Sequence, residues 1–114
     1  MGNDTEEKIF HMHAEVCKSM ANPTRLKILS LLREGEKSVE ELRRQLKLPK
    51  ANLSQHLSLL RQRRILVARR EGLNVYYQCA NRKMLKACEI LREVLMEQLA
   101  EGGRLGQWIN KREK

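Results

Sequence analysis

Several features that would indicate other classes of protein are scarce or missing in this sequence. Aromatic side chains make up only 4% of the 114 residues, too little for the stacking platforms of proteins that bind single-stranded nucleic acid. The three cysteines are an odd number without close spacing, so a disulfide scaffold is not indicated. No apolar run approaches the roughly 18 residues of a membrane span, and residues 1–7 are too polar and acidic for a signal peptide. These absences predict a reduced, cytoplasmic protein that does not enter a membrane.

The sequence also contains no recognisable arrangement of catalytic residues. The sequence has no nucleophile beside a base, no glycine-rich phosphate-binding loop and no pair of carboxylates that would indicate a catalytic pocket. Glycine, with six residues, and proline, with two, are scarce as well, so little of the chain is linker. We therefore predict that the protein is not an enzyme.

The chain does contain an excess of positive charge. Lys and Arg number 23 against 14 Asp and Glu, which gives a formal net charge of +9. Such an excess on a small chain favours a polyanionic partner, most often nucleic acid, although a generally basic surface would have the same composition. The length fits one domain, which we place at residues 1–101, followed by a basic tail at 102–114.

Apolar residues recur with helical spacing in five segments. Asn22 and Pro23 separate the first two, because a proline is best tolerated at the start of a helix. Ser38, followed three residues later by Glu41, is the pattern of a capping box that opens the third. The predicted helices cover residues 4–21, 23–35, 38–45, 50–63 and 82–101.

The spacing at which apolar residues recur changes from 3.6 to 2 residues after the fourth predicted helix. Residues 65–70 and 75–79 are rich in strand-forming side chains, and residues 71–74 between them supply turn chemistry. They predict an antiparallel hairpin. The expected fold class is therefore mainly α with a small β-hairpin.

The order helix, turn, helix, hairpin suits double-stranded DNA. A short helix and a turn would hold the helix at 50–63 at a fixed angle, so that it enters a major groove about 12 Å wide. The hairpin would lie beside it, over the phosphate backbone or the minor groove. Residues 36–77 carry ten basic and four acidic side chains, a net charge of +6 out of the total +9. The alternative is a solvated basic face on a small helical bundle.

Four motifs occur in order along this part of the chain. They are MANPTRLKIL at residues 20–29, SVEEL at 38–42, LSQHLSLL at 53–60 and RREGLNVYY at 69–77. Together they resemble the ArsR family of bacterial and archaeal winged-helix repressors, over about residues 15–101. The resemblance implies a winged helix-turn-helix homodimer, formed by the first and last helices, that binds a palindromic operator. It also implies repression that an inducer relieves, often a metal or a thiol-reactive species.

By position in these motifs, the helix at 50–63 would be the recognition helix. Gln55 can form two hydrogen bonds to adenine, and Ser54 can bond to a base or a phosphate; the alternative is an ordinary solvated helix face. His56 matches a histidine common in the family, which we interpret as a packing residue or a phosphate contact and not as a metal ligand. Pro49 replaces the usual Ser-like cap, so a side-chain contact from there to phosphate is lost. The predicted DNA-binding residues are Lys50, Asn52, Ser54, Gln55 and Ser58 on this helix and Arg69 and Arg70 on the wing.

The ligands of two metal sites that occur in the family are missing. Residues 39–46 contain no Cys or His, and residues 82–101 contain no His, so neither site can be assembled. Cys17 and Cys88, on the first and last predicted helices, remain as candidate sensing residues. A pair of thiolates there would bind a soft metal or metalloid ion such as As(III) or Cd(II), or oxidise to a disulfide. The alternative is that both cysteines are buried and behave as small hydrophobic side chains.

These features predict a dimeric, sequence-specific DNA-binding regulator, a repressor released by a soft metal, a metalloid or a thiol-reactive inducer. The identity of the inducer stays open, and so does the case in which there is none. The alternative is an architectural protein that coats DNA without choosing a sequence, because it would use the same basic surface.

Overall fold

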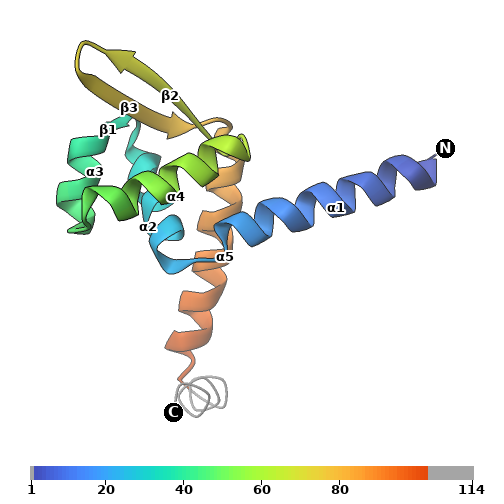
Figure 1. Ribbon diagram of the computed structural model, residues 1–114. Coiled ribbons are helices and arrows are strands. Elements are labelled where there is room, and N and C mark those ends of the chain that lie inside the picture. The colour runs from blue at the N-terminus through green and yellow to red at the C-terminus, as the bar shows by residue number, and fades with distance from the viewer. Residues whose placement is uncertain (1, 103–114) are drawn as a thin grey trace. The chain divides into compact units, whose positions relative to one another are not determined.

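The computed structural model describes residues 2–102, so most of the predicted tail at 102–114 lies outside the described residues. The chain forms two compact units, one that ends at Arg82 and a second that begins at Lys83. The elements, all labelled in Figure 1 except η1, are α1 (Gly2–Met20), α2 (Pro23–Leu31), the 3-10 helix η1 (Leu32–Glu34), β1 (Lys37–Ser38), α3 (Val39–Leu46), α4 (Lys50–Gln62), β2 (Leu66–Glu71), β3 (Asn74–Cys79) and α5 (Arg82–Ala100). The five predicted helices and the predicted hairpin are therefore confirmed.

The core of the first unit is almost purely aliphatic. Burying one such side chain contributes about 1.5–3 kcal/mol, so these contacts are the main stabilisation of the unit and fix how α4 packs against the rest of it. The side chains that are at most 1% exposed are Ile28, Leu29, Leu32, Leu42, Leu53, Leu57, Leu60, Ile65 and Leu66.

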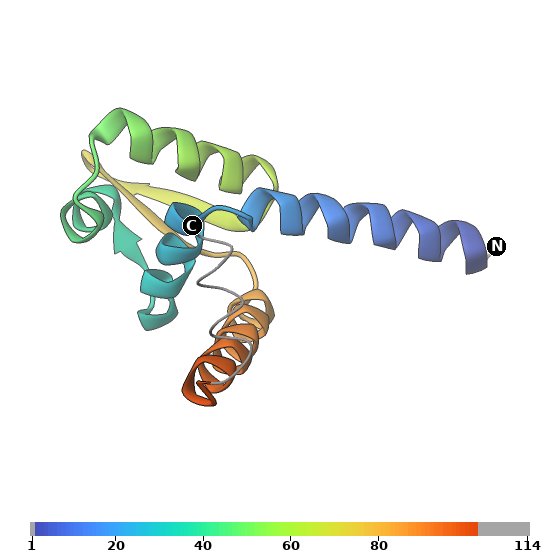
Figure 2. The ribbon, with the colours of Figure 1, turned by 90° about the horizontal axis from the view of Figure 1, so that it is seen from below.

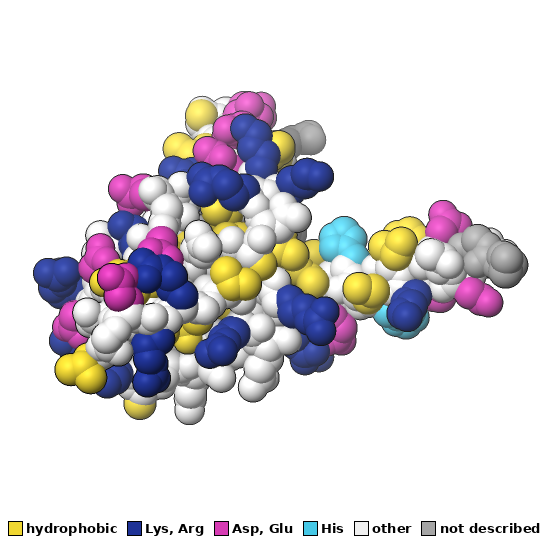
Figure 3. Space-filling view, turned by 90° about the horizontal axis from the view of Figure 1, so that it is seen from above, with side chains coloured by type: hydrophobic (Ala, Val, Ile, Leu, Met, Phe, Trp, Pro, Cys, Tyr) yellow, Lys and Arg dark blue, Asp and Glu magenta, His cyan; other side chains and the backbone are white. Residues whose placement is uncertain are grey.

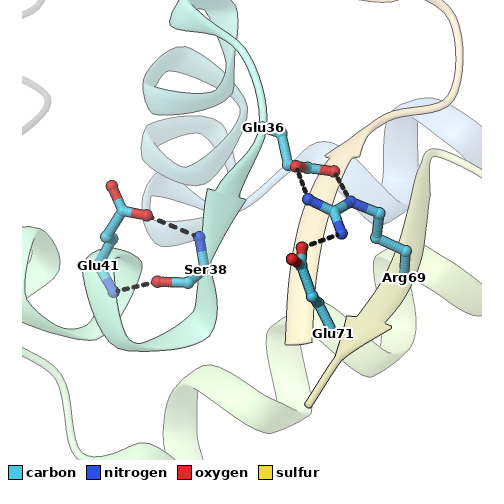
Figure 4. A network of polar contacts seen from close by, with 5 residues as sticks. All are labelled: Glu36, Ser38, Glu41, Arg69 and Glu71. Atoms are coloured by element: carbon cyan, nitrogen blue, oxygen red, sulfur yellow. Dashed lines mark hydrogen bonds and ion pairs between the residues drawn. The ribbon is translucent and has the colours of Figure 1, made fainter. Parts of the chain in front are cut away.

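Side-chain caps set where two of the helices begin. Asn22 Oδ1 accepts hydrogen bonds from the backbone N–H groups of Thr24 (2.9 Å) and Arg25 (3.2 Å), which caps α2 ahead of Pro23. The predicted capping box of α3 is present: Ser38 Oγ accepts from the Glu41 N–H, and the Glu41 carboxylate accepts from the Ser38 N–H, both at 3.1 Å (Figure 4). These reciprocal bonds pair donors that a helix start otherwise leaves without a partner.

The end of α2 differs from the prediction. The sequence suggests one helix as far as Gly35, but α2 ends at Leu31 and tightens into η1. Gly35 then adopts a φ of +128°, a backbone conformation that residues other than glycine rarely adopt.

The hairpin belongs to a sheet with one strand more than predicted. The order is β1-β3-β2, with all pairs antiparallel, and Ser38 of β1 lies opposite Tyr76 of β3. Gly72 and Leu73 connect β2 to β3, and the left-handed φ of +63° at Gly72 suits a tight hairpin turn. Because β1 is only two residues long, it has no alternation of its own that a sequence pattern would reveal.

The first helix exposes large apolar side chains. It leaves the rest of its unit and extends away from it (Figures 1 and 2). Ile9, Phe10 and Met12 are 58%, 67% and 59% exposed, and Figure 3 shows uncovered hydrophobic side chains between charged ones along this helix. It begins at Gly2, two residues earlier than predicted, and Asp4 lies in its first turn.

The last helix, α5, lies almost entirely in the second unit and has the same character. Its Leu85 is buried, whereas most of its larger apolar side chains are not. Contiguous apolar surface of this kind usually marks an interaction site. No helix of the described residues combines the length and apolar character that crossing a membrane requires. The exposed apolar residues of α5 are Ile90, Leu91, Val94, Leu95, Met96 and Leu99.

Candidate nucleic-acid interface

The turn between α3 and α4 is built by backbone conformation. Lys47 ends α3 in the left-handed conformation, with a φ of +55°, and its N–H donates to the Arg43 carbonyl. Pro49 then starts α4 without a side-chain hydrogen bond to the helix, as expected from the departure at this position. The two helices are therefore joined by a turn of only three residues, Lys47 to Pro49.

The fourth helix has one buried and one exposed face. Leu53, Leu57 and Leu60 are at most 1% exposed and anchor it in the core. The opposite face carries amides, hydroxyls and a lysine, groups that hydrogen-bond to base edges and phosphates. All five residues predicted to face DNA from this helix are exposed: Lys50, Asn52, Ser54, Gln55 and Ser58.

The neighbour of this polar face, His56, is half-buried and turned toward the rest of the unit. Arg25 Nε donates a hydrogen bond of 3.1 Å to His56 Nδ1, and Arg25 Nη1 donates one of 3.0 Å to the Ser19 carbonyl at the end of α1. Burial lowers the pKa of His56, and the positive charge of Arg25 lowers it further. These contacts fit the packing interpretation of His56, but nothing in the local sequence pattern predicts Arg25 as its partner.

The first wing arginine, Arg69, is occupied by contacts inside the chain. Its guanidinium donates to both carboxylate oxygens of Glu36, at 2.7 and 2.6 Å, and to Glu71 at 2.6 Å (Figure 4). It also lies over the ring of Tyr76, 4.6 Å from the ring centre. These hydrogen bonds raise the pKa of Arg69 and lower the pKa of the Glu36 carboxyl. Arg69 thus ties β2 and β3 to the residue that precedes β1.

The second wing arginine, Arg70, has a different setting. It follows Arg69 in β2 and lies opposite Val75, so its side chain points to the other face of the hairpin. It is exposed and forms no ion pair with the described residues. The sequence alone does not distinguish the two arginines, because Glu36, the partner of Arg69, lies 33 residues away from it in the chain.

The candidate sensing cysteines lie on α1 and α5, as predicted. Cys17 is exposed and Cys88 is half-buried, and both are free of disulfide bonds. Within the described residues no group of three or more His, Cys, Asp or Glu side chains is placed to hold a metal ion. Sensing by Cys17 and Cys88 therefore stays a prediction.

Comparison with known proteins agrees with this architecture. Residues 22–67 match the family described as "Bacterial regulatory protein, arsR family". The chain is 38% identical over 77 residues to the transcriptional activator HlyU of Vibrio cholerae, covering 68% of this chain and 71% of that protein. It is 37% identical over 82 residues to the transcriptional repressor PagR of Bacillus anthracis, covering 71% and 82%.

A solved structure shows the same fold. It is a homodimeric winged helix-turn-helix DNA-binding domain from Mycobacterium bovis, with 30% identity and a TM-score of 0.79, over 89% of this chain and 94% of that one. In this fold α4 is the second helix of the helix-turn-helix and the β2–β3 hairpin is the wing. The chain therefore belongs to the arsR family of bacterial regulatory proteins and is a winged helix-turn-helix transcriptional regulator, not an enzyme.

Proposed function

We propose that the protein is a dimeric repressor that binds a specific palindromic operator in the cytoplasm. The observation that carries this proposal is the exposed polar face of α4, held beside a wing that presents Arg70, within one compact unit. The relative PagR is named a repressor, which favours repression, while the relative HlyU is named an activator. Repression needs only occupancy of the operator, which the α4 face and the wing would provide.

The proposal assigns a dimer because a single recognition helix reads too short a site. The exposed apolar faces of α1 and α5 provide the surface for self-association, and the similar domain from Mycobacterium bovis is described as homodimeric. In such a dimer the two copies of α4 would lie roughly 34–36 Å apart, one turn of DNA. Each α4 would then enter a successive major groove on one side of the duplex.

The contacts divide into base reading and backbone binding. Gln55 would read adenine through two hydrogen bonds, and Asn52, Ser54 and Ser58 would bond to base edges or phosphates. Lys50 and Arg70 would neutralise phosphates, which makes the affinity depend on salt. Arg69 would lie near the DNA as well. Because two carboxylates already hold its guanidinium, its main role would be to order the wing.

The proposal includes release from the operator by an inducer that acts on the thiols of α1 and α5. Cys17 is an exposed thiol on α1, where binding of a soft metal or metalloid, or oxidation, would disturb the self-association surface. Replacing Cys17 and Cys88 with serine should abolish release of the operator by arsenite, cadmium or an oxidant. A double variant that still releases DNA normally would refute a thiol switch.

The decisive experiment compares DNA sequences. A duplex selected from a random library should be bound at least about a thousand-fold more tightly than an unrelated duplex at physiological salt. The Gln55→Ala variant should lose about ten-fold or more of this preference, because one bidentate base contact contributes roughly 1–3 kcal/mol. Gln78→Ala, which removes an exposed glutamine from β3, is the matched control. Equal affinity for all duplexes would favour the architectural alternative.

A further inference from the structure

Three helices of the first unit meet at one side chain, Arg25. Its backbone N–H is bonded to the Asn22 cap at 3.2 Å, so the residue is fixed in the first turn of α2. Its guanidinium reaches the Ser19 carbonyl, in the last turn of α1, at 3.0 Å and His56 Nδ1, in the middle of α4, at 3.1 Å. The guanidinium is therefore bonded to two helices at once while its backbone belongs to a third.

The chemistry of this contact specifies the state of the histidine. Arginine is always a donor, so the Nδ1 that accepts from Arg25 carries no proton, and His56 is neutral with its proton on Nε2. The second bond places a positive charge at the carbonyl end of α1, where the helix dipole favours a cation. Both bonds therefore suit an arginine, and a lysine could not hold them in the same planar geometry.

The contact between Arg25 and His56 matters for DNA recognition because of where His56 lies on α4. His56 directly follows Gln55, and successive side chains on an α-helix diverge by about 100°. Holding His56 against Arg25 thus fixes the rotation of α4 about its axis and, with it, the direction of Gln55. The leucines beneath α4 fix which face is buried, and the hydrogen bond to Arg25 adds a directional restraint beside Gln55.

A second polar link between α1 and α4 is weaker. Arg63 and Glu15 are 3.6 Å apart and about half exposed, at 48% and 52% of their side-chain surface. Exposed pairs of this kind contribute little, and Arg63 follows the last residue of α4, away from the reading face. Of these two polar links between α1 and α4, the one through Arg25 is therefore the stronger and the closer to Gln55.

We propose that Arg25 is a positioning residue for DNA recognition: it couples the end of α1 to α4 through His56 and thereby sets the direction of Gln55. The proposal rests on the proposed function, since it needs α4 to be the reading helix. It makes α1 more than a self-association surface, because a displacement of its last turn would be transmitted to α4 through one guanidinium.

The test measures the preference for the selected duplex over an unrelated duplex. Arg25→Gln and His56→Leu should each reduce this ratio about ten-fold, and the double variant should lose no more than either single one, because both remove the same contact. Lys27→Gln, which removes an exposed positive charge from the same helix, is the matched control. His56→Asn keeps an acceptor near the position of Nδ1 and should retain most of the ratio.

A readout that needs no DNA separates this proposal from the proposed function. Nitrogen NMR of the free protein should show His56 with an unprotonated Nδ1 that accepts a hydrogen bond, and Arg25→Gln should remove that signature. Additive losses in the double variant, an unchanged ratio in folded Arg25→Gln, or a protonated Nδ1 would each overturn the positioning role. If the wild-type protein shows the NMR signature but no sequence preference, the proposed function fails instead.

Discussion

A single nitrogen, Nδ1 of His56, connects the protonation of one side chain to the packing of three helices. In the folded protein Nδ1 accepts from Arg25, and this is possible only while the imidazole is neutral. Burial and then the charge of Arg25 lower the pKa of His56 from its ordinary value of 6.5. Protonation would replace the hydrogen bond with repulsion between two cations.

The stability of the fold should therefore decrease on acidification below about pH 6.5. The unfolded chain takes up the proton at the ordinary pKa, whereas the folded protein resists it until the pH falls to the lowered pKa, so the loss develops between the two. Urea unfolding from pH 7.5 to 5 measures it. His56→Asn should have a flatter profile, because it lacks the titrating group; equal slopes in both proteins would contradict the assignment.

Residues that interact across the fold are the ones that sequence reasoning cannot pair. The exposed face of α4 could be predicted, because Leu53 and Leu57 mark the buried side and the 3.6-residue period then gives the residues on the opposite side. Arg25 and His56 are 31 residues apart, and Arg69 and Glu36 are 33 apart. Their pairing depends on how helices and strands pack, which no local pattern contains.

At the level of elements, the wing is held by polar contacts as well as by backbone pairing. Arg69 of β2 joins Glu36 and Glu71 (Figure 4), and it also lies over the ring of Tyr76 in β3. Because two carboxylates already hold its guanidinium, we expect Arg69 to order the wing more than it attracts DNA. Arg70, on the opposite face, is exposed, and we expect it to be the wing arginine that contacts a phosphate.

The two wing arginines should therefore differ in the salt dependence of DNA binding. Arg70→Ala should weaken binding to all duplexes about equally and reduce the slope of log affinity against log salt by about 1.8, because a dimer loses two phosphate contacts at about 0.9 each. Arg69→Ala should change this slope less, because the Arg69 guanidinium is paired with Glu36 and Glu71 and not with a phosphate. Fluorescence anisotropy at several KCl concentrations measures both. Equal slopes for the two variants would show that Arg69 also binds phosphate.

Element boundaries were predictable where a local signal exists and not elsewhere. The capping box at Ser38 and the turn around Gly72 are encoded in a few neighbouring residues, and both are confirmed. Strand β1 was missed because Lys37 and Ser38 become a strand only by pairing with Tyr77 and Tyr76 of β3. A two-residue strand owes its existence to its partner.

At the scale of the whole molecule, most of the large apolar side chains that are exposed lie on other elements than the predicted DNA-binding residues. The apolar side chains that remain exposed are concentrated on α1 and α5, while the polar reading face and Arg70 belong to α4 and the wing. A monomer would leave Phe10, at 67% exposure, and Leu99, at 58%, in water. Self-association through these two helices would remove this cost.

A charge placed within the apolar face of α1 should therefore separate the subunits. Phe10→Glu should convert the dimer to a monomer in light scattering, because a carboxylate is costly to bury without a partner. Affinity for the full palindrome should fall by about 100-fold or more, since the two half-sites no longer reinforce each other. Asn3→Asp, which adds the same charge at an exposed position of α1, is the control. If Phe10→Glu stayed dimeric and bound DNA normally, α1 would not form the subunit interface, and the spacing of the two reading helices would need another origin.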